Sequence, residues 1–206
     1  MAKQEVSLHQ LSDYLPEGSA DDVIRYLIQY KVHLTITRKR ESVLGDYRNA
    51  HLGKAHRISV NGNLNRFAFL ITLLHELAHL LTYEKYRHQV SPHGKEWKSI
   101  FGQLLIIFIE KKIFPADIEQ ALHHSLKNPA ASSCGDTALL RVLRNYDPKK
   151  ENHFLLEQIP DGSAFTINDG RSFTRVKKIR TRYQCVEIGT NKQYLFSGLY
   201  EVRRIN

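Results

Sequence analysis

The chemistry and the fold of this sequence both depend on one stretch, His75-Glu76-Leu77-Ala78-His79. An α-helix advances about 100° per residue, so residues four apart return to the same face one turn later. His75 and His79 can therefore direct two imidazole nitrogens at one point, at the distance of about 2.0–2.1 Å that Zn²⁺ requires. Glu76 would project beside them, where it can hold a water on the metal. The spacing is that of an H-E-x-x-H zinc site.

The stretch lies within a long helical segment, Leu64 to Tyr86, that is apolar on most of its sides. A helix that is hydrophobic nearly all round belongs in the middle of a core. Burying two histidines and a carboxylate there without partners would cost about 1–3 kcal/mol for each group. A bound metal is the simplest compensation, so we interpret the pattern as a zinc site and not as a chance match.

Two histidines do not complete a catalytic zinc site, because three protein ligands and a water are usual. His93 is the best third candidate, since thirteen residues separate it from His79 and leave room for the chain to turn back. The alternatives are His88, Glu84 and Glu96. Zinc in such a site lowers the pKa of its water toward about 7, and Glu76 would then remove the proton as general base.

The segments on either side predict alternating helices and strands. Ser19 and Asp22 have the spacing of a capping box at the start of a helix. Asn61-Gly62 predicts a turn. We expect strands at Val32–Thr37 and His56–Val60, and further helices at Gly94–Lys112, Pro115–Leu126 and Thr137–Asn145.

The segment Leu34–Trp97 resembles the SprT-like family, which includes the Spartan-type proteases that digest proteins crosslinked to DNA. The resemblance rests on Thr35-Ile-Thr-Arg38, Leu44-Gly45, Ile58-Ser-Val-Asn61, the H-E-x-x-H stretch and His93-Gly-Lys-Glu-Trp97. It implies a zincin-like core, in which a small sheet packs on the metal-binding helices, with His93 as the third zinc ligand. It also implies a zinc metallopeptidase that hydrolyses proteins, with proteins bound or crosslinked to DNA as one substrate class.

A peptidase of this type also needs a residue that stabilises the oxyanion. Tyr83, Tyr86 and His88 are candidates that the sequence does not separate. We expect Trp97 to pack beneath the metal site and not to contact substrate. His51 and His56 could line the cleft, although a surface or strand position is the more common outcome for such histidines.

The chain is expected to form two domains. The polar segment Asp147 to Asn152 marks the boundary between a zincin core with a helical extension at 1–148 and a small basic β-barrel-like domain at 149–206. In the second domain, Asp169-Gly170 predicts a hairpin, and Gly189-Thr-Asn191 separates a second pair of strands. The overall fold class is therefore α+β.

The charge of the chain favours a polyanionic partner. Thirty Lys and Arg stand against 21 Asp and Glu, a formal charge of +9, and phosphate contacts by such residues release counterions. The cations of the second domain that could contact DNA, near Phe173 and Tyr183 as stacking aromatics, are Arg171, Arg175, Lys177, Lys178, Arg180 and Arg182. The alternative is a solvated charged face that discourages pairing of strand edges.

The remaining features indicate a cytoplasmic protein without a membrane segment. The longest apolar run, Leu104 to Ile109, is far shorter than the eighteen or so residues that span a bilayer, and the N-terminus has no apolar signal region. The two cysteines, Cys134 and Cys185, cannot form the zinc ribbon that many SprT-like proteins carry. The competing interpretation is a nucleic-acid-binding or scaffold protein with a structural or vestigial zinc site.

Overall fold

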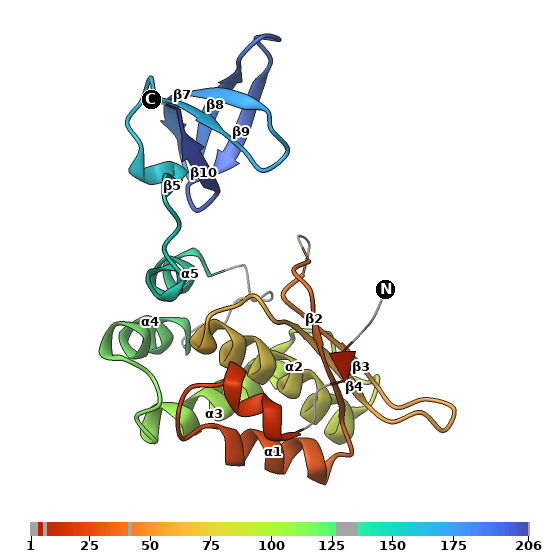
Figure 1. Ribbon diagram of the computed structural model, residues 1–206. Helices are drawn as coiled ribbons and strands as arrows, with labels where there is room; N and C mark the ends of the chain where they lie inside the picture. The colour runs from red at the N-terminus through yellow and green to blue at the C-terminus, as the bar shows by residue number, and fades with distance from the viewer. Residues whose placement is uncertain (1–3, 6–7, 41–42, 127–135, 206) are drawn as a thin grey trace. The chain divides into compact units, whose positions relative to one another are not determined.

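The computed structural model describes residues 4–5, 8–40, 43–126 and 136–205. It contains helices and two β-sheets, and the chain divides into two compact units, Met1–Asp147 and Pro148–Asn206 (Figure 1). The division lies one residue before the boundary predicted from the polar segment. Helices occur in the first unit and the second unit is built mainly of strands, so each is described by itself.

The first unit contains a four-stranded sheet in the order β1-β2-β4-β3. Its two central strands, β2 and β4, are parallel, whereas β1 and β3 run antiparallel to their neighbours. β3 is thus an edge strand that pairs with β4 on one side. The strands are β1 (Gln4–Glu5), β2 (His33–Thr37), β3 (Gly45–Arg48) and β4 (Arg57–Asn61).

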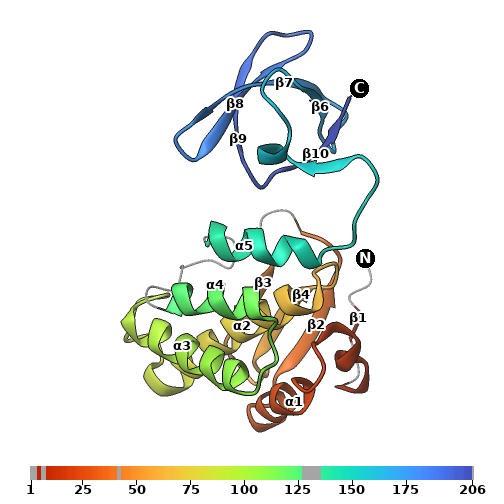
Figure 2. The same ribbon diagram turned by 90° about the vertical axis from the view of Figure 1, so that its left-hand side faces the viewer.

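Helix α2, which carries the H-E-x-x-H stretch, lies between the sheet and α3 (Figures 1 and 2). It packs on β3 and β4 on one side and on α3 on the other, which explains why it is apolar on most of its sides. Beside the short 3₁₀ turns η1 (Leu8–Tyr14) and η2 (Arg144–Tyr146), the helices are α1 (Ala20–Gln29), α2 (Arg66–Tyr86), α3 (Lys95–Glu110), α4 (Ala116–Leu126) and α5 (Thr137–Leu143).

The N-termini of α2 and α1 differ in whether the capping signal in the sequence is realised in the structure. Asn65 caps α2, because its side-chain oxygen accepts a hydrogen bond of 3.0 Å from the Ala68 N–H. The capping box predicted at Ser19 is wrong, since the Ser19 hydroxyl donates to the Pro16 carbonyl at 2.6 Å. Asp22 is instead buried and forms an ion pair with Lys111, at the end of α3.

The second unit is a six-stranded antiparallel sheet in the order β5-β10-β6-β7-β8-β9. The predicted hairpin at Asp169-Gly170 joins β6 to β7, and Gly170 has the positive φ of 87° that this turn requires. A short 3₁₀ turn, η3 (Leu156–Gln158), follows the first strand. The strands are β5 (His153–Leu155), β6 (Ala164–Thr166), β7 (Ser172–Ile179), β8 (Arg182–Glu187), β9 (Gln193–Ser197) and β10 (Glu201–Arg204).

Each unit has its own hydrophobic core. The core of the first unit gathers around α2 and includes the fully buried Trp97 and Phe108 of α3. The core of the second unit consists of Leu156, Ile159, Phe165, Ile167, Phe173, Tyr183, Cys185 and Val202.

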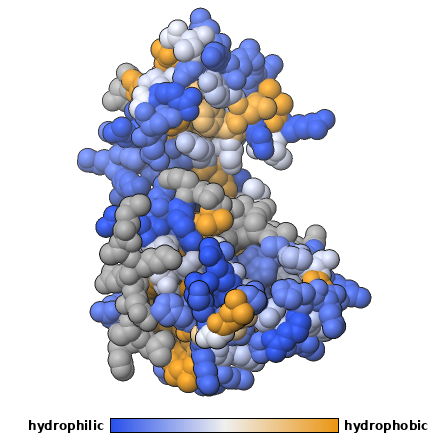
Figure 3. All heavy atoms as spheres, turned by 90° about the vertical axis from the view of Figure 1, so that its right-hand side faces the viewer, coloured by the Kyte–Doolittle hydropathy of each residue, from blue (hydrophilic) through white to orange (hydrophobic). Residues whose placement is uncertain are grey.

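On the face drawn in Figure 3, the surface is largely hydrophilic and its apolar residues form separate small patches.

Among the described residues, no helix combines the length and the apolar character that crossing a membrane demands.

Candidate metal centre

Three histidines converge beside α2. One ring nitrogen from each of His75, His79 and His93 lies within 4.8 Å of the others. His75 and His79 are one turn apart on α2, as their spacing predicts, and His93 reaches them from the turn that precedes α3. The Nε2 atoms of His75 and His93 are 3.3 Å apart. In the part of the chain that the structure describes, this is the one cluster of three such groups.

The rings are held in place by aromatic packing. Trp97 is fully buried, and its ring lies 4.6 Å from the ring of His75, 5.3 Å from His79 and 4.7 Å from His93, centroid to centroid. Trp97 thus packs against all three histidines, as the sequence predicts. Its neighbour Phe101 stacks on Trp97 at 5.0 Å, so one face of α3 forms the floor of the site.

The backbone at His93 is in an uncommon conformation. Its φ of 59° lies in the left-handed region, which costs a residue with a side chain roughly 1 kcal/mol or more. Gly94 follows as the N-cap of α3 with an extended conformation. The turn at His93-Gly94 therefore accepts strain while it holds the imidazole toward α2, and such strain is concentrated at functional positions.

Burial keeps the three histidines neutral. The pKa of His75 is lowered to about 3, mainly by burial and also by the neighbouring His79 and His93. Burial and the neighbouring His93 lower the pKa of His79 to about 4, and burial also lowers the pKa of His93. A neutral imidazole is the form that binds a metal, so the site is prepared for a cation without first losing protons.

The donor set fits zinc. With Zn–N distances of about 2.0–2.1 Å, two nitrogens of a tetrahedral site are about 3.3–3.4 Å apart. The separation of 3.3 Å between His75 Nε2 and His93 Nε2 matches that edge. Among the described residues the cluster offers three ligands, the number that catalytic zinc sites use together with a water.

Glu76 lies next to the triad and is 5% exposed. The backbone of β3 passes close to Glu76: a Cβ added to Gly45 would lie 2.5 Å from Glu76 Oε1. The pKa of Glu76 is raised to about 8, mainly by burial and also by the charge of Asp46, while the charge of Arg40 opposes the rise. A divalent cation held by the histidines would favour the carboxylate, since an opposite charge nearby stabilises the ionised form.

Comparison with known families identifies the domain. Residues 17–113 match the SprT-like family. The chain contains a SprT-like domain. The resemblance predicted from the sequence is thereby confirmed, and this family is of the zinc metallopeptidase type. The match covers α1 to α3 and all three histidines. No solved structure gives a significant match to the chain.

The alternative ligands lie apart from the histidine cluster of the SprT-like domain. Glu84 contacts His56 and Arg87. His88 is exposed, with its ring against Tyr83 at 5.2 Å. Glu96, in the first turn of α3, lies 3.9 Å from Lys95.

The three residues considered for oxyanion stabilisation also have assigned neighbours. Tyr83 follows His79 by one turn on α2 and packs against the rings of His56 and His88. Tyr86 lies beneath the Lys85 ammonium at 5.2 Å. Tyr83 thus lies one turn beyond His79, and Tyr86 lies about two turns beyond His79 on the same side of α2.

Sequence reasoning missed Tyr47 beside the site, and it considered His56 only as a residue that could line the cleft. The ring of Tyr47 on β3 is parallel to the ring of His79, with centroids 6.4 Å apart. Its hydroxyl donates to Nδ1 of the buried His56 at 2.9 Å, and burial raises the pKa of Tyr47, which keeps this donor protonated. A tyrosine two residues after Gly45 on the same strand face was the signal available in the sequence.

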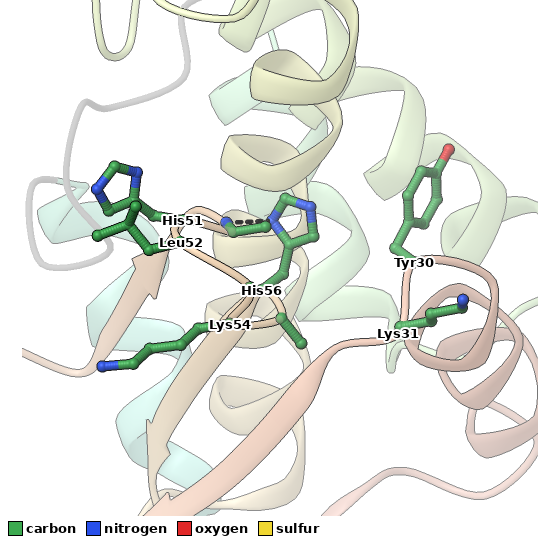
Figure 4. A pocket seen from close by; sticks show the side chains of 9 residues that line it. Tyr30, Lys31, His51, Leu52, Lys54 and His56 are labelled. Atoms are coloured by element: carbon green, nitrogen blue, oxygen red, sulfur yellow. Dashed lines mark hydrogen bonds between the residues drawn. The ribbon is translucent and has the colours of Figure 1, made fainter.

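His56 is held on both ring nitrogens. Its Nδ1 also accepts from the Ala50 N–H at 3.2 Å, the bond drawn in Figure 4. The proton therefore lies on Nε2, which faces Glu84 Oε1 at 3.3 Å. His56 also belongs to the wall of a surface pocket formed by Tyr30, Lys31 and residues 50–56 (Figure 4). That pocket contains none of the three clustered histidines.

The six cations singled out in the second unit fall into two groups. Arg175 is tied inward, with Nη1 donating to the Leu156 carbonyl at 2.9 Å and Nε 2.7 Å from Asp161 Oδ1. Arg171 donates to Asp169 at 2.8 Å. The four that stay exposed, without a described ion pair, are Lys177, Lys178, Arg180 and Arg182. The aromatics expected to stack on bases, Phe173 and Tyr183, are buried in the core.

Proposed function

We propose that this chain is a zinc-dependent metallopeptidase with a zincin-like core that hydrolyses protein substrates. The observation that carries the proposal is the convergence of His75, His79 and His93 beside the buried carboxylate of Glu76. Membership of the SprT-like family, a zinc metallopeptidase-type family, supports the same conclusion independently of the geometry.

Each residue has a defined role in the proposed reaction. His75, His79 and His93 would hold the zinc through their ring nitrogens. When bound, zinc supplies a Lewis acid that polarises the scissile carbonyl and makes water a better nucleophile at neutral pH. Glu76 accepts a proton from the attacking water as the new C–O bond forms. It then donates that proton to the amine nitrogen as the C–N bond breaks.

The edge strand β3 supports a peptide as substrate. It pairs with β4 on one side, and no described strand pairs with its other side. An extended peptide can add to such an edge through main-chain hydrogen bonds. Because Gly45 of β3 lies against Glu76, a peptide on this edge would pass the proposed general base. The substrate segment must be extended, which favours loosely folded proteins.

For the second unit we propose DNA as partner, bound through phosphate contacts. The support is the exposed group Lys177, Lys178, Arg180 and Arg182 on β7, β8 and the turn between them. Without exposed aromatics at Phe173 and Tyr183, base stacking is not part of this proposal. Four phosphate contacts correspond to a slope of about −3.6 in a plot of log K against log salt for duplex DNA, and replacing Lys177 and Lys178 by alanine should reduce it by about 1.8.

The test of the enzyme is cleavage of a loosely folded DNA-binding protein, with and without single- and double-stranded DNA. Wild type is compared with Glu76→Gln, and with Glu110→Gln as a control for loss of an exposed carboxylate. We expect Glu76→Gln to lower kcat by about 10²–10⁴-fold while zinc binding stays close to that of wild type. Glu110→Gln should cleave normally.

The outcomes separate the proposal from its rival. Cleavage that depends on Glu76 and is stimulated by DNA supports both a peptidase and a DNA-bound substrate. Cleavage without stimulation keeps the peptidase and removes DNA from its activity. Full activity in Glu76→Gln, or zinc binding with no cleavage under any condition, would favour a nucleic-acid-binding or scaffold protein with a structural zinc site.

A further inference from the structure

We infer that Gly45 is a positioning residue for Glu76, because only a residue without a side chain lets β3 lie against the proposed general base. The inference rests on the function proposed above. A Cβ on Gly45 would lie 2.5 Å from Glu76 Oε1, 2.8 Å from Glu76 Cγ and 2.9 Å from Thr72 Cγ2. Non-bonded carbon atoms are optimally separated by about 3.5–4.0 Å, so the Glu76 and Thr72 side chains would have to move to admit even a methyl group at Gly45.

The strand that carries Gly45 is anchored at its start. The side chain of Asn61, which is 1% exposed, donates to the carbonyls of Arg40 and Val43 at 3.1 and 3.0 Å. Its oxygen accepts from Arg40 Nε at 2.7 Å. The Leu44 carbonyl, next to Gly45, accepts from the Asn61 backbone N–H at 2.8 Å and from Arg40 Nη2 at 3.3 Å.

The strand is also anchored two residues later. Gly45 and Tyr47 point to the same face of β3, as alternate residues in a strand do, and that face is turned to α2. The Tyr47 ring is parallel to the His79 ring, and its hydroxyl is bound to His56. The small residue thus faces the carboxylate, and the large residue faces one of the histidines on the next turn.

These anchors decide which side gives way when Gly45 is enlarged. β3 is held through Leu44 and Tyr47, whereas the Glu76 carboxylate is the far end of a flexible side chain. A methyl group at Gly45 should therefore displace the Glu76 side chain and the Thr72 methyl group, and leave the strand in place. The histidines should not move, because Trp97 packs against all three rings. The expected result is a protein that folds and binds zinc with its general base out of position.

The experiment compares Gly45→Ala with wild type, Glu76→Gln and the control Gly102→Ala. Among the described residues, a Cβ on Gly102 meets only Leu126 Cδ2, at an ordinary 3.6 Å. The measurements are crystal structures, zinc affinity by chelator competition, and kcat and KM separately. For Gly45→Ala we expect a displaced Glu76 carboxylate, unchanged zinc affinity, and kcat lowered by about 100-fold, the order of loss that a misplacement of about 1 Å can cause. Gly102→Ala should match wild type.

The readouts distinguish this inference from the proposed function. If Glu76 keeps its position in the Gly45→Ala crystal structure, or if kcat is unchanged while Glu76→Gln is inactive, the positioning role is refuted and the peptidase stands. If wild type and Glu76→Gln cleave equally, the peptidase is refuted, and the crystal structures still decide whether Gly45 sets the position of Glu76. A parallel loss of zinc by Gly45→Ala would also contradict the inference, since it would indicate general disruption of the site.

Discussion

The helix α2 and the strand β7 both carry conspicuous polar residues in the sequence, but the fold treats them in opposite ways. On α2, His75 and His79 stay together, and His93 joins them to form one cluster. On β7, the neighbouring cations separate, because Arg175 is bound to carbonyls of its own unit whereas Lys177 stays exposed. The histidines and the cations behave differently because the two sets are spaced differently along the sequence.

The histidines are related by a period that matches the helix, so local geometry places them on one face. The cations of the second unit share no such spacing; they are only numerous within a short segment. Along a strand, successive side chains point to opposite faces, and a register shift between Arg175 and Lys177 changes the pattern again. A spacing that matches the local structure therefore predicts a site more reliably than the number of charges in a segment.

The largest expected effect concerns the third histidine, which tests whether the cluster acts as one unit. His93→Ala should weaken zinc binding by more than about 100-fold, because loss of an outer partner of a ligand alone costs about 10–100-fold. Cleavage should be lost with the metal. Zinc content after dialysis against a weak chelator measures the effect. His88→Ala, which removes an exposed histidine, is the matched control, and loss of zinc from it in place of His93→Ala would contradict the assignment.

The second effect sharpens the contrast between the two kinds of cation on β7. Arg175→Ala should destabilise the second unit by about 2–3 kcal/mol, since it leaves buried carbonyls without a donor. Lys177→Ala should change the free energy of unfolding by less than about 0.5 kcal/mol.

Labelling of the buried Cys185 thiol measures the unfolding of the second unit in Arg175→Ala and Lys177→Ala. Burial raises the pKa of its thiol to about 11, so labelling at neutral pH should require unfolding of the unit. With Cys134, which lies outside the described residues, replaced by serine, thiol labelling along a urea series follows the second unit alone. Equal midpoints for Arg175→Ala and Lys177→Ala would show that the inward bonds of Arg175 do not stabilise the unit.

The smallest effect concerns the hydroxyl that joins β3 to His56. Tyr47→Phe keeps the ring beside His79 and removes one hydrogen bond, which should cost about 1 kcal/mol. The fluorescence of Trp97, the one tryptophan of the chain, reports urea unfolding of the first unit. Tyr30→Phe is the control, because the Tyr30 hydroxyl makes no hydrogen bond that the structure describes. A loss of zinc by Tyr47→Phe would mean that the hydroxyl also supports the metal site.

Much of the first unit follows from local sequence signals. The apolar segment Leu64 to Tyr86 predicts α2 almost to the residue. The helix begins at Arg66, directly after its N-cap Asn65. The edge strand β3 could not be assigned, since its four residues have neither a clear alternation nor β-branched side chains. The capping box at Ser19 failed because Lys111, far away in the sequence, binds Asp22.

The sequence by itself determined the helix α2, the pair of histidines on its face and the acid beside them, because helical geometry places residues three or four positions apart on one face. The sequence ranked His93 first among several candidates, and tertiary structure brought it into the cluster. Tertiary structure alone placed Gly45 against Glu76 and Tyr47 beside His79. These contacts depend on how β3 packs on α2, and no local period of the chain encodes the distance between two elements.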